Sequence, residues 1–379
     1  MSKIKKAKVC ILPGDGIGVD VVEAAIKVLD TVGFSTQAEY LYGDIGWEFW
    51  KTEGNPLPDR TIELLKECNC SLFGAITSKP KEEAIAELNP GLKDQGLVYF
   101  SPIVKLRQLF DLYVNLRPCK AYPGNPLNYR DDIDLIVFRE NTEGLYSGVE
   151  WHPVPEAVMR VLAENHPKAK RFADFALDDL AISTRIFTRK GVQRILRAGM
   201  EYAKEFGYKT ITVVEKPNVI RETSGLMVRE ARKLIQSYQL ELWETNIDAM
   251  AMWLIKNPQD YGVLVTSNMF GDIISDEAAQ LVGGLGFARS GNIGDKMAVF
   301  EPTHGSAPKY VGQNKVNPIA QILAAKMMLD WLNEKEMAQR IDNAVAEVIK
   351  EGKARTYDMG GSTSTTGMAD AICNKIETS

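Results

Sequence analysis

Three arginines stand at the ends of apolar segments and could together hold a substrate that carries several carboxylates. Arg107, Arg117 and Arg139 each follow an apolar run, where a helix or strand would deliver the side chain to a rim. A guanidinium group binds a carboxylate through two parallel hydrogen bonds. The net charge of −5 provides no general positive field, so an anionic substrate needs such a local cluster. Taken singly, each arginine is more often an ion-pairing surface residue, but the set favours a di- or tricarboxylate.

A tyrosine and a lysine are the candidates for proton transfer. Tyr146 lies between Gly144 and Gly148 after an apolar run, in the kind of loop that often carries catalytic groups. Because an unperturbed phenol has a pKa of about 10, it is a poor acid–base group at neutral pH unless a cation lowers that pKa. Lys216 ends another apolar run and could be that cation. The alternative for Tyr146 is a packed ring whose hydroxyl is satisfied by hydrogen bonds.

Two aspartates one helical turn apart could bind a divalent metal ion. Asp272 and Asp276 stand at positions i and i+4, where like charges repel at a cost of roughly a few tenths of a kcal/mol. A divalent cation would remove this repulsion, and Asp248 is a third candidate ligand. Oxygen ligands without a nearby histidine or cysteine favour Mg²⁺ or Mn²⁺ over zinc. The alternative is that Asp272 caps a helix N-terminus and Asp276 is exposed.

Two glycine-containing loops could lie beside a bound ring or phosphate. The segment from Glu301 to Tyr310 contains a His-Gly pair among small residues, which would let the backbone approach a ligand closely, although a lone histidine is more often structural. The turn at Gly14–Gly18 has the spacing GxGxG rather than GxGxxG, and no acidic residue ends a clear second strand about 20 residues further on. We therefore interpret that turn as a structural feature near the site.

These residues must be positioned by helices and strands, whose hydrophobic patterns alternate along the chain. The alternation predicts an α/β fold with a largely parallel sheet. Two segments interrupt it: Lys79–Tyr99, expected to be a surface excursion beside the site, and Tyr122–Asp132, expected to be a turn between two strands. The expected strands are Lys8–Leu12, Cys70–Gly74, Asp134–Phe138, Ile211–Val214 and Val263–Val265. The expected helices are Val19–Val32, Thr61–Lys66, Val104–Phe110, Gly191–Phe206, Asp272–Val282 and Asn317–Leu332.

Length and composition exclude several classes of protein. A chain of 379 residues is too long for one comfortable core and suggests two domains. No stretch reaches the roughly 18 apolar residues of a membrane helix, and Val9–Leu12 is too short for the apolar core of a signal peptide. The five cysteines are an odd number and suggest reduced thiols. We therefore expect a cytoplasmic protein with no membrane or nucleic-acid partner.

Taken together, these stretches resemble the β-decarboxylating dehydrogenases, a family that includes isocitrate, homoisocitrate, 3-isopropylmalate and tartrate dehydrogenases. The resemblance runs from Val9 to about Asp370, and the motifs occur in the order typical of the family. They are GDGIG, LRxxxDLYxNLRP, RENTEGLYSG, GDIISDEAAQLVGGLG and HGSAP. As a set they are highly specific, although each alone is weak.

The resemblance implies an isopropylmalate dehydrogenase-like, doubly wound α/β fold rather than a Rossmann fold. Residues 1–112 and 283–379 would form a large domain on the cofactor side. Residues 113–282 would form a small domain that carries metal and substrate residues and the dimer interface, with a clasp at about 144–188. The protein would be a homodimer with shared active sites, in which Lys216 and Asp248 complete the site of the neighbouring subunit.

The resemblance also implies a role for each matching residue. Tyr146 would be the general acid, and Lys216 would handle the proton of the substrate hydroxyl. Asp248, Asp272 and Asp276 would hold Mg²⁺ or Mn²⁺. The residues expected to bind the substrate are Thr77, Ser101, Arg107, Arg117 and Arg139. The residues expected to bind the cofactor are Asn218, Glu301, His304, Gly305, Ser306, Ala307, Lys309, Tyr310, Val316 and Asn317.

The motifs favour isocitrate as the substrate, with homoisocitrate as the alternative. Ser101 is present, but Ile103 stands where isocitrate enzymes carry asparagine. In this respect the segment looks more like that of homoisocitrate enzymes. The segment Arg139–Gly148 and the pair Lys309-Tyr310 look like those of isocitrate enzymes. The Glu-x-x-Leu-Leu of isopropylmalate enzymes is absent, which makes a branched apolar substrate less suitable; tartrate and malate are further alternatives.

For the cofactor the pattern favours NADP, with NAD also possible. Lys309 and Tyr310 replace the acidic–apolar pair that NAD-using relatives place against the adenosine ribose, and a lysine attracts a 2′-phosphate. Two further cationic positions of the NADP type are occupied by Gly361 and Asn257. A rival interpretation is a non-catalytic regulatory subunit of an isocitrate dehydrogenase. Such subunits lose site residues, whereas all the catalytic and metal positions are filled here.

Overall fold

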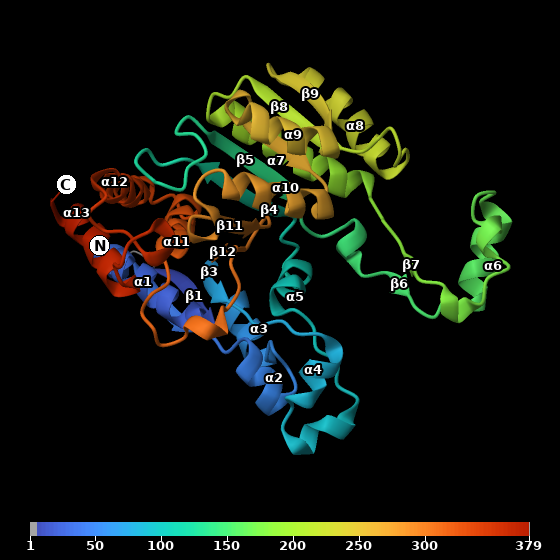
Figure 1. The fold of residues 1–379 in the computed structure, drawn as a ribbon, viewed down its shortest axis with the longest axis horizontal. Helices are drawn as coiled ribbons and strands as arrows, with labels where there is room; N and C mark the ends of the chain where they lie inside the picture. The colour runs from blue at the N-terminus through green and yellow to red at the C-terminus, as the bar shows by residue number, and fades with distance from the viewer. Residues whose placement is uncertain (1–5, 379) are drawn as a thin grey trace.

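The computed structural model describes residues 6–378, and its centre is a ten-stranded sheet (Figure 1). The strands follow the order β2-β1-β3-β12-β11-β4-β5-β10-β8-β9. They are β1 (Ala7–Gly14), β2 (Ala38–Tyr42), β3 (Cys70–Ala75), β4 (Val114–Lys120), β5 (Asp134–Glu140), β8 (Thr210–Glu215), β9 (Glu241–Asn246), β10 (Val263–Thr266), β11 (Arg289–Ile293) and β12 (Ala298–Pro302). All five strands expected from the sequence are present, each within a few residues of its expected bounds.

The sheet is parallel on both flanks and antiparallel in the middle. Strands β2, β1, β3 and β12 pair in parallel, as do β5, β10, β8 and β9. The three central pairings, β12 with β11, β11 with β4 and β4 with β5, are antiparallel. The expected turn at Tyr122–Asp132 joins β4 to β5 directly, which is why these neighbours run in opposite directions. The α/β class is confirmed, and so is the expectation of a largely parallel sheet, because six of the nine strand pairings are parallel.

Helices cover both faces of the sheet, so its strands alternate between two buried layers. In β1, Val9 and Ile11 belong to one apolar core, and Cys10 and Leu12 to another. Because both faces are covered, the strands are nearly continuous apolar runs. The main helices of the fold are α1 (Ile17–Thr31), α2 (Trp47–Glu53), α3 (Asp59–Lys66), α5 (Pro102–Leu109), α7 (Arg189–Glu205), α8 (Thr223–Leu234), α9 (Ile247–Lys256), α10 (Asn268–Gln280), α11 (Ile319–Trp331), α12 (Lys335–Glu351) and α13 (Thr365–Thr378).

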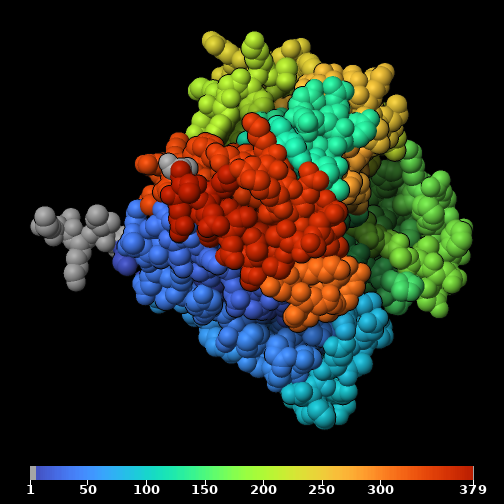
Figure 2. Space-filling model, turned by 60° about the vertical axis from the view of Figure 1, so that its left-hand side comes forward, coloured from blue at the N-terminus to red at the C-terminus, as the bar shows by residue number. Residues whose placement is uncertain are grey.

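The two ends of the chain share one core. Side chains of α1 pack with those of α11, α12 and α13, and Figure 2 shows the first and last segments of the chain side by side. The middle of the chain has its own cores, built on α7 and α8 and on α9 and α10. One continuous sheet runs through both parts, so the domain limits at 112/113 and 282/283 stay a prediction.

An arm projects from the body between β5 and α7 (Figure 1). It consists of the two-stranded sheet of β6 (Glu150–Trp151) and β7 (Ile182–Ser183), followed at its tip by α6 (Glu156–Asn165). Large apolar side chains are exposed on it, among them Val161, Phe172 and Phe175. The arm lies within the segment 144–188 for which a dimer clasp is expected.

One local difference from the sequence prediction concerns the site. Helix α10 begins at Asn268, preceded by Ser267 at the capping position, so Asp272 lies inside the helix and does not cap it. The segment Lys79–Tyr99 forms the short helix α4 (Lys81–Ala86) and a 3₁₀ turn, Pro90–Gln95, and packs on α2.

All five cysteines are free. Between residues 6 and 378, no helix has both the length and the apolar character needed to cross a membrane.

Candidate active site

Arginines from two central strands meet the aspartates of α10. Arg139 on β5 is buried; its Nε and Nη2 donate to Asn268 Oδ1 at 3.0 and 2.8 Å, and its Nη1 pairs with Asp272. Arg117 on β4 pairs with Asp276 at 2.9 Å and with Asp272 at 3.3 Å. The residues come together because the antiparallel pair β4–β5 lies directly beneath α10. The structure thus joins four predicted site residues in one cluster.

The third arginine lies next to this cluster. Arg107 of α5 donates from Nε to Asn292 at 2.9 Å and makes a longer 3.4 Å ion pair with Glu301. Burial lowers the pKa of Arg107, and the charge of Arg117 lowers it further. Burial, followed by repulsion from Arg117 and Arg107, lowers the pKa of Arg139 to about 9. An anionic ligand would relieve this concentration of positive charge.

Tyr146 lies in the 3₁₀ turn Leu145–Ser147, above Arg139 and α10. Its hydroxyl donates to Asp272 Oδ2 at 3.1 Å, and the guanidinium of Arg139 lies 5.6 Å from the ring centroid. Burial and the charge of Asp272 raise the pKa of Tyr146, and Arg139 opposes this only in part. The suggestion that Lys216 lowers this pKa is therefore not met within one chain. The raised pKa makes the phenol a weaker acid, so the arrangement within one chain does not itself activate Tyr146.

The aspartate pair fits part of a site for a hard divalent cation. The side chains of Asp272 and Asp276 are 33% and 60% exposed, so both carboxylates can reach a ligand outside the protein. Burial raises the pKa of Asp276, Arg117 opposes this and Asp272 adds to it, so negative charge is crowded here. Among residues 6–378, no group of three acidic, histidine or cysteine side chains is arranged to hold a metal. The remaining ligands must come from elsewhere.

Lys216 follows β8, the strand next to β10, and Asp248 lies at the start of α9, which packs against α10. The Lys216 ammonium pairs with the Asp248 carboxylate and lowers the pKa of that group. The Asp248 side chain is 67% exposed, so the pair stands at the surface of a single chain. Asn218 lies two residues after Lys216 in the same exposed turn. Their expected place in a neighbouring subunit's site stays a prediction.

The loop after β12 brings the predicted cofactor residues together. Ser306 Oγ lies 2.6 Å from Thr77 Oγ1, which joins this loop to the loop after β3. A Cβ on Gly16 would lie 2.2 Å from the Ser306 carbonyl oxygen, so the glycine turn is needed for this close approach. Ser101 stands half-buried at the start of α5. The GxGxG turn is thus a structural element beside the site, as interpreted from its spacing.

The same loop offers unsatisfied polar atoms to a ligand. Among the described residues, His304 Nε2 and Thr303 Oγ1 are buried without a hydrogen-bond partner. Gly305 is exposed beside them, and Ala307 packs with the apolar cluster of Ile17 and Val316. Asn317 donates to Asp358 at 3.0 Å. Orphaned polar atoms beside an apolar surface suit a cofactor that carries both a ring and hydrogen-bonding groups.

A group of aromatic and basic side chains ends this loop. The rings of Tyr310 and Tyr357 lie 5.4 Å apart, and the ammonium of Lys309 lies 4.9 Å from the Tyr310 centroid. Lys315 lies 5.9 Å from Tyr310 and 4.8 Å from Tyr357. A hydrogen bond with Tyr357, aided by the two lysines, lowers the pKa of Tyr310. The cluster is locally positive and suits a phosphate.

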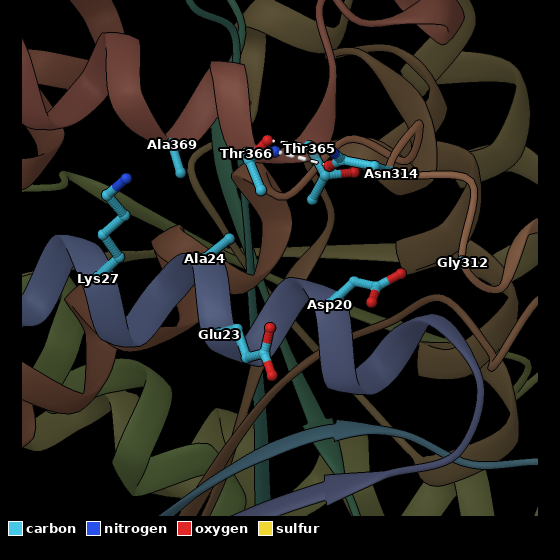
Figure 3. Close-up of a pocket in the computed structure, with 9 residues that line it drawn as sticks. All are labelled: Asp20, Glu23, Ala24, Lys27, Gly312, Asn314, Thr365, Thr366 and Ala369. Carbon is cyan, nitrogen blue, oxygen red and sulfur yellow. Dashed lines mark hydrogen bonds between the residues drawn. The ribbon is translucent and has the colours of Figure 1, made fainter.

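A separate cavity of about 310 Å³ lies behind this loop, between α1 and the start of α13 (Figure 3). Asn314 contacts Thr366 twice, accepting from its backbone N–H at 3.0 Å and donating to its hydroxyl at 2.9 Å. Asp20, Glu23 and Lys27 line the α1 side. These contacts anchor the loop, and the arginine cluster lies outside the cavity.

Sequence reasoning missed the residues that hold these groups in place. Asp15 accepts from the backbone N–H groups of Trp47 and Thr77, at 2.7 and 2.8 Å, and so orients Thr77. Burial raises the pKa of Asp15, and these two hydrogen bonds oppose the rise. Asn268 and Asn292 hold Arg139 and Arg107. Neither asparagine is near its arginine in the sequence, so no local signal could have identified these contacts.

Comparison with known proteins agrees with this geometry. Residues 8–372 match the family described as isocitrate/isopropylmalate dehydrogenase. The chain is 40% identical to protein DlpA of Legionella pneumophila over 98% of its length, and spans 59% of that longer protein. It is 40% identical to a 3-isopropylmalate dehydrogenase of Methanothermobacter thermautotrophicus, covering 99% of this chain and all of that one. It is 38% identical to an isocitrate/homoisocitrate dehydrogenase of Thermus thermophilus, with 98% of each covered.

The fold is also similar to that of a solved structure. The isocitrate dehydrogenase of Methylococcus capsulatus superposes with a TM-score of 0.84 at 35% identity, over 98% of this chain and 99% of that one. The family match, the relatives and this fold agree along nearly the whole chain. The protein therefore belongs to the isocitrate/isopropylmalate dehydrogenase family of metal-dependent, β-decarboxylating dehydrogenases.

Proposed function

We propose that the protein oxidises isocitrate and decarboxylates it to 2-oxoglutarate, with reduction of NADP and with Mg²⁺ or Mn²⁺. The observation that carries the proposal is the meeting of Arg117 and Arg139 with the carboxylates of α10, with the Arg107 guanidinium close enough to lower the pKa of Arg139. Three buried guanidinium groups suit a substrate with three carboxylates. Two adjacent carboxylates suit a hard cation beside it.

The residues of the chain divide the proton transfers between them. Hydride leaves the carbon that carries the hydroxyl, and Lys216 of a neighbouring subunit takes the hydroxyl proton. CO₂ then leaves from the adjacent carbon, and Tyr146 gives that carbon a proton. Asp272 and Asp276, with Asp248 of the neighbour, would hold the cation. When bound, the nicotinamide accepts the hydride and the cation polarises the carbonyl oxygen.

The positive cluster at the end of the cofactor loop supports NADP over NAD. Lys309 and Lys315 both lie within 6 Å of the Tyr310 ring, at 4.9 and 5.9 Å. A carboxylate here would accept ribose hydroxyls and repel a 2′-phosphate, whereas two ammonium groups attract it. Gly361 and Asn257 leave two other cationic positions empty, so NAD remains a usable cofactor.

Homoisocitrate is the second candidate substrate, because two kinds of observation favour it. Ile103 stands where isocitrate enzymes carry asparagine, and a relative that is 38% identical is named for both acids. However, Ile103 is buried in the core with Leu106, one helical turn further along α5. Packing accounts for an apolar residue there without a longer substrate, which supports isocitrate as the first choice. A regulatory subunit is disfavoured because the arginines, aspartates and Tyr146 are all in place.

The arm supports assembly into a homodimer with shared sites. Its tip exposes Val161, Phe172 and Phe175, which a second copy would cover. The Asp248 carboxylate of the Lys216–Asp248 pair is likewise exposed on a single chain.

Steady-state kinetics with purified protein test the proposal. We expect the highest kcat/KM with isocitrate and NADP, a lower value with homoisocitrate, and dependence on added Mg²⁺ or Mn²⁺. Titration of 3-isopropylmalate and NAD in the same assay gives the comparison. A preference for 3-isopropylmalate would reject the substrate, and no turnover of any of the three acids would reject catalysis by the chain alone.

A further inference from the structure

Asn292 lies at the centre of a buried polar network beside the active site. Its amide oxygen accepts hydrogen bonds from Arg107 Nε at 2.9 Å, from Asn115 at 2.8 Å and from Asn141 at 3.0 Å. Its amide nitrogen donates to Glu301 at 2.6 Å. The Asn292 side chain is completely buried. One neutral side chain thus connects three strands and helix α5.

Sheet register places the network next to the substrate arginines. Asn292 on β11 pairs with Asn115 on β4, and Asn115 pairs with Arg139 on β5. Residues paired across adjacent strands project on the same face of a sheet. Arg117 is two residues further along β4 and therefore shares that face. Its Nε donates to Asn115 Oδ1 at 2.7 Å.

Arg107 and Arg117 are therefore both held through the Nε atom of the guanidinium group. The Nε of Arg107 is bound to Asn292 directly, and the Nε of Arg117 is bound through Asn115. The other contact of Arg107 to a side chain within residues 6–378 is the 3.4 Å ion pair with Glu301. This leaves the outer nitrogens of Arg107 able to turn toward a carboxylate.

The neutrality of Asn292 matters as much as its position. A carboxylate at this place would pair with Arg107 and compete with an anionic substrate. It would also stand beside Glu301, to which the amide nitrogen of Asn292 now donates. An amide instead satisfies several donors at once and adds no second carboxylate beside that of Glu301, which already pairs with Arg107 at 3.4 Å.

We propose that Asn292 is a positioning residue, which holds Arg107 directly and Arg117 through Asn115 in the orientation that receives the carboxylates of the substrate. The proposal rests on the proposed function, since it takes a polycarboxylate as the ligand. It assigns Asn292 no contact with the substrate.

The test combines two substitutions at Asn292 with a double-mutant cycle. Asn292→Ser removes the amide that reaches Arg107, and Asn292→Asp keeps the shape but adds a charge. Ser290→Ala is the matched control, because Ser290 is buried on the same strand and its contacts to Asn115 and Glu301 are 3.5 and 3.4 Å. Arg107→Ala, alone and with Asn292→Ser, completes the cycle. The readouts are kcat and KM for the acid that the wild type prefers, at saturating cofactor and metal.

We expect Asn292→Ser to lower kcat/KM by about 10- to 100-fold, mostly through KM, because hydrogen bonds to a charged group carry this much binding. Ser290→Ala should stay within about twofold of the wild type. In the Arg107→Ala background the effect of Asn292→Ser should fall to about threefold or less, because the two substitutions act on one interaction. A purely structural role would give the same factor in both backgrounds and would overturn the proposal.

Other outcomes are also decisive. An acid KM within about twofold of the wild type in Asn292→Ser overturns the proposal. If that variant fails to fold, Asn292→Asp decides, and an unchanged acid KM there overturns it. If the wild type turns over none of the three acids (isocitrate, homoisocitrate and 3-isopropylmalate), the proposed function fails. The positioning role is then read from calorimetric binding of citrate to the same proteins, with the same expected pattern.

Discussion

Tyr146 and Asp272 are joined by a hydrogen bond of 3.1 Å, although 126 residues separate them in the sequence. The bond links the turn after β5 to helix α10. Because burial and the Asp272 charge raise the pKa of Tyr146, the phenol holds its proton at neutral pH. The protonated form that a donor needs is therefore present, but the raised pKa makes the phenol a weaker acid, and a cation beside it would lower that pKa.

Replacement of Tyr146 by phenylalanine should lower kcat by about 10²- to 10⁴-fold, because it removes the proton donor. The KM for the acid should change by no more than about threefold, since the arginines that bind it stay in place. Steady-state kinetics measure both constants. Tyr129→Phe, at an exposed position outside the site, is the control. Full activity in the Tyr146 variant would reject its role as the acid.

Replacement of Asp276 by asparagine should raise the Mn²⁺ concentration for half-maximal activity at least about tenfold, since affinity follows the charge of the ligands. Electron paramagnetic resonance of bound Mn²⁺ should show the same weakening without turnover. Asp59→Asn, on the surface of α3, is the control with the same loss of charge. Unchanged Mn²⁺ binding would place the cation elsewhere.

Replacement of Gly16 by alanine should displace the loop after β12, which contains Ser306 and the residues expected to bind the cofactor. A Cβ at this position would lie 2.2 Å from the Ser306 carbonyl oxygen, and the backbone has a φ of +60°. Gly33 has a φ of +94° but no atom within 4 Å of such a Cβ, so Gly33→Ala measures backbone strain alone. Gly33→Ala, in the left-handed helical region at ψ 7°, should lose about 1–2 kcal/mol to strain, and Gly16→Ala, at ψ −128° outside that region, should lose more. Only Gly16→Ala should also raise the KM for the cofactor, and equal cofactor KM values in the two variants would contradict this.

The comparison of Gly16 with Gly33 also shows what sequence could and could not predict. Local patterns were sufficient for the strand at residues 7–14 and the helix that follows, because hydrophobic period and glycine spacing are local properties. The reason for Gly16, contact with Ser306 some 290 residues later, depends on how β1, β3 and the loop after β12 pack. Nothing local distinguishes the two glycines.

Nonlocal pairing limited the prediction of the sheet and the site in the same way. The antiparallel centre follows from β11 entering between β12 and β4, which no run of apolar residues reveals. The arginines could be identified by residue type and motif, but Asn292 could not, because an asparagine inside a strand becomes informative only when its buried partners are known. The roles of Lys216 and Asp248 depend on a second subunit and stay predictions.

Replacement of Lys309 by glutamate should reverse the preference between the two nicotinamide cofactors. The substitution puts a carboxylate beside Tyr310, where it repels a 2′-phosphate and accepts ribose hydroxyls. We expect kcat/KM with NADP to fall about 100-fold, since a hydrogen bond to a charged group contributes up to about 3 kcal/mol. With NAD it should stay within about threefold. Lys353→Glu, at an exposed position away from the loop, is the control. An equal loss with both cofactors would show that Lys309 supports the loop and does not select the phosphate.

Replacement of Asp342 by asparagine should destabilise the fold in a manner that depends on pH. Asp342 on α12 accepts from Tyr122 at 2.6 Å and from Lys120 at 3.0 Å, where β4 ends. Burial alone would raise the pKa of Asp342, but these hydrogen bonds and the lysine charges outweigh it, so the pKa is lowered.

Because the folded-state pKa lies below the unfolded value, the contribution of Asp342 is complete above the unfolded pKa and is lost as pH falls through the folded one. We expect the variant to lose about 1–3 kcal/mol of unfolding free energy, and this loss should be constant from pH 8 to pH 5. The difference should close only below about pH 4, near the ordinary pKa of an aspartate. Urea denaturation across this range measures it. A difference that already shrinks between pH 8 and pH 5 would mean that another group titrates in this contact.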